Sequence, residues 1–239
     1  MVESPKSRVI LKLSGELFGE NGNHIDFDKY DSVALQLIEI RRQSPEMQIA
    51  IVVGGGNIFR GRQADSQVDH TEADSMGMMA TIINGLGLRE AFLRNGQTDT
   101  RLMTSISMPE IAEPYIKHRG RHHLEQGRIV IIAGGLGRPN FSTDSAAAQC
   151  GAELQCDKLY KASTVDGIYD SDPRKNPQAK KLSRITFQQA LDKQLGVMDL
   201  TAFAMCMRSN LPIFVFDIKD LNRLPEAING NYSFGTIVQ

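Results

Sequence analysis

Short runs of aliphatic and β-branched residues alternate along the chain with longer segments in which apolar residues recur every three or four positions. Strands buried on both faces read as continuous apolar runs, and strands separated by helices pair in parallel. The apolar runs predict strands at Arg8–Leu13, Gln48–Val53, Arg101–Thr104, Arg128–Ala133, Lys158–Lys161 and Pro212–Phe216. We therefore expect an α/β fold, a three-layer sandwich with a central, mainly parallel sheet between helices.

The segments between these strands have helical spacing. In the first of them, Tyr30, Val33, Leu37 and Ile40 follow the helical repeat. Helices are expected at Asp28–Gln43, Thr71–Asn95 and Thr143–Leu154, with weaker ones at Thr186–Lys193 and Ala202–Ser209. Tyr169–Asn176 is the most loop-like interior segment. Because no internal repeat or low-complexity linker interrupts the pattern, residues 1–239 are expected to form a single domain.

Composition narrows the classes of protein. The chain has 27 Lys and Arg against 28 Asp and Glu, a formal net charge of −1, which makes a general nucleic-acid binder unlikely because such proteins gather cationic residues on one face. Cys150, Cys156 and Cys206 lack metal or redox spacing and are expected to be reduced apolar fillers. No apolar run resembles a signal peptide or a membrane span, so we expect a cytoplasmic protein.

Glycine-rich segments follow two of the strands. Lys12-Leu13-Ser14-Gly15 follows the first strand, and Gly54-Gly55-Gly56 follows the second. Glycines without Cβ atoms let backbone N–H groups approach a phosphate, although a Gly triplet equally permits a plain tight turn. Arg60, a few residues later, favours the phosphate interpretation because a guanidinium grips phosphate oxygens in pairs.

A second glycine loop, Gly134 to Pro139, follows the fourth strand and leads into a helix with Ser142 or Thr143 as N-cap. Two such loops indicate two phosphate-bearing groups, and neither has the spacing of a P-loop or a dinucleotide fold. Asp144 could simply offset the positive end of its helix.

After the fifth strand, Lys161 to Pro173 could hold a ribose and a purine, although a hairpin turn explains Asp166-Gly167 equally well.

These motifs in this order resemble the bacterial uridylate kinases of the amino acid kinase superfamily, from Arg8 to Val238. The resemblance is carried by Leu11 to Glu16, Gly54 to Gly61, Asp74-Ser75-Met76-Gly77-Met78, Ser142 to Ala146, Val165 to Pro173 and Val197-Met198-Asp199-Leu200. It implies the amino acid kinase fold and transfer of the ATP γ-phosphoryl to UMP. It also implies Mg²⁺ accompanying ATP, a homohexamer, and GTP and UTP as possible effectors.

The resemblance further implies site residues. Lys12, Arg60 and Asp144 would be catalytic. ATP would contact Lys12, Leu13, Ser14, Gly15, Gly56, Arg60, Ser163, Tyr169 and Asp172. UMP would contact Gly55, Asp74, Leu136, Gly137, Arg138, Pro139, Asn140, Phe141, Ser142 and Thr143. The N-terminal part of the domain would thus bind mainly UMP and the C-terminal part mainly ATP.

Several positions carry more than one interpretation. Leu136 and Arg138 stand where the resembling proteins often have Thr and Asn. The basic segment Lys117–His123 is expected to be a solvated loop or helix end. Asp157 and Asp199 could support the site or be structural, and Met76 to Met79 could pack in an interface but more readily in the core. The competing functions are a superfamily kinase for a carboxylate or carbamate, and a catalytically silent nucleotide sensor.

Overall fold

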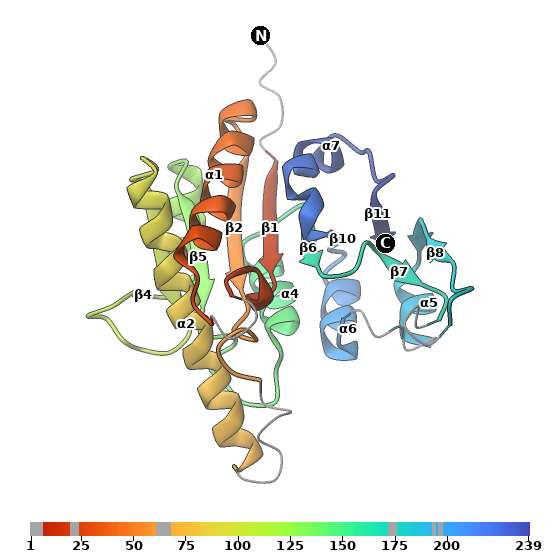
Figure 1. Ribbon diagram of the computed structural model, residues 1–239, viewed down its shortest axis with the longest axis horizontal. Coiled ribbons are helices and arrows are strands. Elements are labelled where there is room, and N and C mark those ends of the chain that lie inside the picture. The colour runs from red at the N-terminus through yellow and green to blue at the C-terminus, as the bar shows by residue number, and fades with distance from the viewer. Residues whose placement is uncertain (1–6, 20–23, 61–67, 172–175, 193–194, 196–197) are drawn as a thin grey trace.

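A mainly parallel sheet forms the centre of the computed structural model, which describes residues 7–19, 24–60, 68–171, 176–192, 195 and 198–239 (Figure 1). The strand order is β4-β3-β5-β2-β1-β6-β10-β11-β9. The strands are β1 (Arg8–Leu13), β2 (Gln48–Val53), β3 (Thr100–Thr104), β4 (Glu113–Pro114), β5 (Ile129–Ala133), β6 (Lys158–Ser163), β9 (Arg184–Ile185), β10 (Ile213–Asp217) and β11 (Gly235–Val238). Within the sheet just described, only the β10–β11 pair is antiparallel.

Helices cover both faces of this sheet. One face packs against α1 (Phe27–Gln43), α2 (His70–Arg94), the 3₁₀ segment η3 (Ile218–Arg223) and α7 (Leu224–Ile228). The other packs against α3 (Lys117–Glu125), α4 (Thr143–Glu153), α5 (Phe187–Asp192) and α6 (Leu200–Arg208). A short 3₁₀ turn, η1 (Gly15–Leu17), follows β1, and a separate hairpin joins β7 (Ile168–Tyr169) to β8 (Lys181–Leu182). The three layers confirm the expected fold class.

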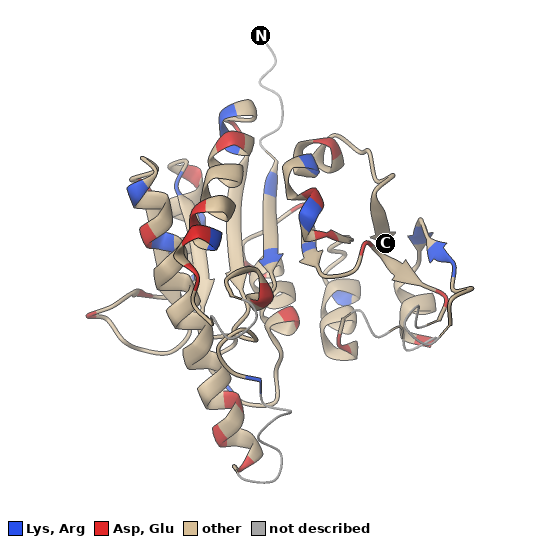
Figure 2. Ribbon diagram, viewed as in Figure 1, with Lys and Arg blue, Asp and Glu red and all other residues tan. Residues whose placement is uncertain are grey.

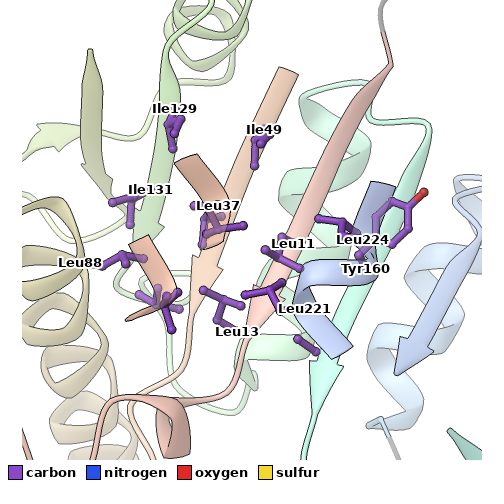
Figure 3. Close-up of a cluster of buried hydrophobic side chains, with 14 of the residues drawn as sticks. Leu11, Leu13, Leu37, Ile49, Leu88, Ile129, Ile131, Tyr160, Leu221 and Leu224 are labelled. Carbon is purple, nitrogen blue, oxygen red and sulfur yellow. The ribbon is translucent and has the colours of Figure 1, made fainter. Parts of the chain in front are cut away.

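Alternation along the strands divides the core into two clusters. In β1, Val9, Leu11 and Leu13 pack on the α1 and α2 side, part of which is drawn in Figure 3, whereas Ile10 packs on the α4 side. Successive side chains of a strand point to opposite faces, so Lys12 points toward the α4 side with Ile10. The position of Lys12 in the strand therefore decides which helix it can reach.

The six predicted strands and five predicted helices are confirmed to within two residues at each end. Ser142 is the N-cap of α4, one of the two residues expected there. Cys150 and Cys206 are buried and all three cysteines are free. Acidic and basic residues are interspersed along α1 rather than gathered by sign (Figure 2). In the described part of the chain, no helix has both the length and the apolar character that crossing a membrane requires.

Other expectations were wrong in whole or in part. The basic segment Lys117–His123 belongs to helix α3, and most of it is exposed as expected, but Gly120 and His123 are buried. The His123 Nε2 lies 3.0 Å from the Glu113 Oε2. Met76 and Met79 are 47% and 44% exposed, so they do not pack in the core. Tyr169, expected in a loop, lies in strand β7. For His123 and Tyr169 the deciding partner, Glu113 or Lys181, lies ten or more residues away, which local patterning cannot detect.

An aromatic cluster closes the end of the sheet near β10 and β11. The Phe214 ring lies 5.1 Å from Tyr232 and from Phe234, 5.5 Å from Phe216 and 6.2 Å from Tyr160, measured between centroids. Phe214 is fully buried, and offset or edge-on aromatic pairs add to the free energy gained by burial alone. Phe214 is therefore a main packing contact of this region.

We predict that Phe214→Ala lowers the free energy of unfolding by about 3–5 kcal/mol, because it leaves a cavity that four neighbouring rings cannot fill. Urea denaturation followed by circular dichroism measures the change. Leu35→Ala serves as the control, since Leu35 is 52% exposed on α1 and its truncation should stay within about 0.5 kcal/mol. Equal midpoints for the two variants would contradict the importance of the cluster.

Candidate functional site

The candidate site lies where four neighbouring parallel strands end. Strands β5, β2, β1 and β6 are adjacent in the sheet, and their carboxyl ends are Ala133, Val53, Leu13 and Ser163. Because parallel strands end at the same edge, the segments that follow them meet in one crevice. The two glycine loops, the Lys12 segment and the segment after β6 are thus brought together, although they are far apart in sequence.

A cluster of three charges lies at the centre of this edge. Lys12 on β1 and Lys161 on β6 are register partners, and both reach Asp144 in the first turn of α4. The Lys12 Nζ lies 3.3 Å from Asp144 Oδ1, and the Lys161 Nζ donates a hydrogen bond to Oδ2. Lys161 is only 5% exposed. One carboxylate therefore holds two ammonium groups, which leaves the cluster with one excess positive charge.

Burial and charge compete for the pKa values in this cluster. Burial alone would raise the pKa of Asp144, but the positive charges of Lys12 and Lys161 outweigh it and hold that pKa below its ordinary value. Burial lowers the pKa of Lys161, and the Asp144 carboxylate only partly restores it. Asp144 is therefore ionised at neutral pH, and Lys161 depends on Asp144 to keep its proton as pH rises.

Asp144 is held in place by the capped start of its helix. The Ser142 hydroxyl accepts hydrogen bonds from the Asp144 N–H at 3.0 Å and the Ser145 N–H at 3.2 Å. The hydroxyls of Ser142 and Ser145 in turn donate to Asp199, which also accepts from the Ala202 N–H at 2.8 Å and so caps α6. Asp199 therefore joins the N-termini of two helices beside the charge cluster.

The first glycine loop packs against the segment after β1 and against α2, too closely to admit side chains at Gly54 and Gly55, whereas Gly56 has open space around it. A Cβ on Gly15 would lie 2.5 Å from the Gly56 nitrogen, and a Cβ on Gly55 would lie 2.9 Å from the Gly77 carbonyl oxygen. Glycine is required at both positions because any larger residue would push the loop outward. Close backbone packing without Cβ atoms at these positions is what an anion-binding loop requires.

Arg60 borders this loop and already holds a carboxylate. Its Nε donates to the Gly56 carbonyl oxygen at 2.9 Å, and its guanidinium pairs with Glu16. The Arg60 and Glu16 side chains are 51% and 40% exposed, and exposed ion pairs contribute only about 0–1 kcal/mol. An incoming phosphate can therefore replace Glu16 on Arg60 at little cost.

The second glycine loop contacts the start of α2. Gly134, Gly135 and Gly137 have positive φ, and so does Asn140 at +69°. The Asn140 N–H donates to Asp74 Oδ2 at 2.6 Å. This bond brings Asp74 to the loop with which it was expected to share a ligand, and Phe141, 40% exposed, follows at the open side of the same loop.

The segment after β6 was also expected to contribute to the site. Ser163 is the last residue of β6, and the Tyr169 hydroxyl donates to Asp166 Oδ1 at 2.8 Å. That hydrogen bond raises the pKa of Tyr169, and Lys181 pairs with the other Asp166 oxygen at 3.1 Å. Asp172, expected to contact ATP, lies outside the described residues. Ser163 thus ends a strand at the site, and Tyr169 lies in the separate β7–β8 sheet.

The structure sorts the remaining sequence expectations. Asp157 does not support the site: its carboxylate accepts the Arg8 N–H at 2.8 Å at the starting ends of β1 and β6, opposite the crevice. Leu136 packs its side chain against the core on the α4 side. Sequence reasoning missed Lys161 as a site residue. A lysine inside a strand expected to be buried was the available signal, since lysines are rarely buried unpaired.

The carboxylates at the charge cluster are already hydrogen-bonded or ion-paired. No group of three or more His, Cys, Asp and Glu residues suited to a metal occurs in the parts of the chain that the structure describes. Of the carboxylates at the cluster, Asp144 is bound by two lysines and Asp199 by two hydroxyls and an N–H. This donor set suits Mg²⁺ that arrives on nucleotide phosphates with its own waters.

Known proteins resemble this chain in sequence and in fold. Residues 7–217 match the amino acid kinase family. Uridylate kinase of Corynebacterium efficiens is 44% identical over 97% of this chain and 94% of its own. The UMP kinase structure from Bacillus anthracis superposes with a TM-score of 0.92 at 35% identity, covering 99% of this chain and 97% of that one. For UMP kinase from Ureaplasma parvum the TM-score is 0.90 at 36% identity, covering 99% and 100%. The chain therefore belongs to the amino acid kinase family, among its uridylate kinases.

Proposed function

We propose that this protein transfers the γ-phosphoryl group of MgATP to UMP and so forms UDP and ADP. The observation that carries the proposal is the buried cluster of Lys12, Asp144 and Lys161, which lies between two glycine loops at one edge of the sheet. Two loops suit two phosphate-bearing substrates, and a net positive cluster between them suits the negative charge of the group in transit.

The acceptor needs little chemical activation. A phosphate monoester has a second pKa of about 6, so the UMP phosphate already carries a nucleophilic anionic oxygen at neutral pH. Catalysis then consists of aligning two highly charged phosphates and neutralising the transferred group. Lys12 and Lys161 would supply the positive charge, and Asp144 would act through them by fixing both ammonium groups in advance.

The two substrates would divide the crevice between them. ATP phosphates would lie on Lys12 to Gly15 with Gly56 and Arg60, and its adenosine on Ser163, Tyr169 and Asp172. UMP would lie over Gly55, with Asp74 binding the ribose hydroxyls and residues 136–143 surrounding phosphate and base. The bond between Asp74 and the Asn140 N–H supports this assignment, since it joins the two expected parts of one subsite.

Further parts of the proposal concern partners. Mg²⁺ would enter with ATP, neutralising the charge of its phosphates. The exposed Met76 and Met79 on α2 support a subunit contact, in keeping with the hexamer expected from the resemblance. GTP and UTP as effectors, and a cytoplasmic location, stay predictions.

A coupled ADP-release assay tests the function. Purified protein with MgATP should turn over UMP, with little activity on CMP, acetylglutamate or carbamate, and UDP should appear in equal amount to ADP. Turnover of the non-nucleotides alone would identify a carboxylate or carbamate kinase instead. Binding of both UMP and ATP without UDP formation would identify a nucleotide sensor.

Removing the first cation should slow the chemical step. Lys12→Ala is expected to lower kcat by about 10²–10³, the usual loss when one preorganised partner of the developing charge is removed. Steady-state kinetics with both substrates saturating measures this. The control is Lys219→Ala, an exposed lysine after β10; a near-normal kcat in Lys12→Ala would exclude Lys12 from the transfer.

Changing the expected ribose ligand should affect one substrate selectively. Asp74→Asn keeps the side-chain shape but loses the charge that strengthens hydrogen bonds to ribose hydroxyls. The KM for UMP should rise by about tenfold, which corresponds to about 1.4 kcal/mol, while the KM for ATP stays within about twofold. A larger rise in the KM for ATP would mean that the two subsites are exchanged.

The pH profile should report the coupling inside the charge cluster. Asp144 raises the pKa of Lys161, which burial holds below its ordinary value, so Asp144→Asn should lower that pKa further. Lys161 must be protonated to act, and therefore the loss of kcat at alkaline pH should begin at lower pH in Asp144→Asn than in the wild type. Glu39→Gln on the surface of α1 should leave the profile unchanged. An alkaline limb that stays in place or moves upward in Asp144→Asn would contradict the coupling.

A further inference from the structure

Helix α2 carries two polar residues, Thr81 and Asn84, that lie inside the protein directly under the two glycine loops. Thr81 is 4% exposed and Asn84 is fully buried. Residues three apart lie on the same side of a helix, so both point toward the sheet edge where the loops begin. Burying polar side chains is unfavourable unless their hydrogen bonds are made, and apolar residues would fill these positions without that requirement.

Asn84 bonds to the first loop with its full hydrogen-bonding capacity. Its Nδ2 donates to the Gly54 carbonyl oxygen at 2.7 Å and to Asn57 Oδ1 at 2.7 Å. Its Oδ1 accepts from the Tyr30 hydroxyl at 2.6 Å and from Asn57 Nδ2 at 3.2 Å. Burial raises the pKa of Tyr30 to about 12, so its hydroxyl stays a donor. The loop is thereby fixed at both ends of the glycine triplet.

Asn57 extends this network to the segment before α1. Its Nδ2 donates to the His24 carbonyl oxygen at 2.7 Å, and its own carbonyl oxygen lies 2.6 Å from the His24 Nδ1. The Asn57 Oδ1 also lies against Gly15, where a Cβ would approach it to 2.7 Å. The mutually hydrogen-bonded side chains of Asn57 and Asn84 therefore support the contact between the first glycine loop and the segment after β1.

Thr81 bonds to the second loop. Its Oγ1 accepts from the Gly134 N–H at 2.7 Å and donates to the Met78 carbonyl oxygen at 2.7 Å. Gly134 is the first residue after β5 and has a φ of +83°. The bond therefore fixes the loop at the point where it leaves the sheet. One rigid helix thus contacts the two loops, through side chains one turn apart.

We propose that Asn84 and Thr81 are positioning residues, which hold the two glycine loops at a fixed separation and so align the phosphate donor with the acceptor. The proposal rests on the function proposed above, in which Gly56 contacts ATP, Gly55 contacts UMP, and the Gly134 loop surrounds UMP. Misplacing reacting groups by about 1 Å can cost about 100-fold in rate. Neither residue need touch a substrate to have such an effect.

Two substitutions that nearly keep the shape of the side chain test the roles of Thr81 and Asn84 separately. Thr81→Val removes the acceptor for the Gly134 N–H, and we expect the KM for UMP to rise about 5- to 10-fold with the KM for ATP within about twofold. Asn84→Leu releases the loop shared by both substrates, and we expect kcat to fall about 10- to 100-fold, more than either KM rises. Each kinetic constant is measured on folded protein, with its melting temperature recorded.

Ile82→Val is the matched control, because Ile82 is a buried neighbour on α2, 2% exposed, whose side chain packs in the hydrophobic core. It should lower the melting temperature yet leave both KM values and kcat within about twofold. Should Asn84→Leu not fold, Tyr30→Phe removes only the hydroxyl donor to Asn84 and should still lower kcat more than the control. Kinetic constants of Thr81→Val and of the Asn84 or Tyr30 variant equal to those of Ile82→Val would overturn the proposal. An inactive wild type would instead overturn the proposed function.

Discussion

The ion cluster of Lys12, Asp144 and Lys161 is the interaction on which the rest of the site depends. Two unit charges about 4 Å apart interact by about 4 kcal/mol at an effective dielectric constant of 20, enough to offset part of the cost of burying a lysine. Two ammonium groups share one carboxylate, so Lys12, Asp144 and Lys161 together carry one excess positive charge, with Asp199 beside them also favouring the charged form of Lys161. That excess is what the proposed transfer of an anionic group requires.

The parallel sheet is what makes this cluster possible. Lys12 and Lys161 are register partners on adjacent strands, so their side chains leave the same face of the sheet. Asp144 meets them because α4 begins beside that face, with its start fixed by Ser142 and Asp199. The first glycine loop packs closely on the segment after β1 and on α2 because Gly54 and Gly55 lack Cβ atoms. Helix α2 holds both glycine loops through buried hydrogen bonds. The charge cluster and the packing of the glycine loops thus shape the same edge of the sheet.

Much of the fold could be predicted from the sequence because burial on both faces leaves continuous apolar strands. The glycine loops, Lys12, Arg60 and Asp144 could also be singled out, since they belong to short motifs at the ends of strands or in the segments that follow them. Lys161 could not be assigned a role, because only the fold brings it to Asp144 on α4 and places Lys12 beside it across the register of β1 and β6. Asn84 and Thr81 escaped notice for a similar reason: within a helical pattern they resemble ordinary polar positions. Helix α3 was expected only as a solvated loop or helix end, because its sequence, KHRGRHHLE, lacks an apolar repeat; its buried residues are Gly120, His123 and Leu124.

A structure of the protein with UMP and a non-hydrolysable MgATP analogue tests the central claim most directly. We expect the γ-phosphate of the analogue within hydrogen-bonding distance of both Lys12 and Lys161. The UMP phosphate should lie in line with it, on the side away from the β-phosphate, and the second glycine loop should enclose the uracil. Nucleotides bound elsewhere, or a γ-phosphate that contacts neither lysine, would contradict it.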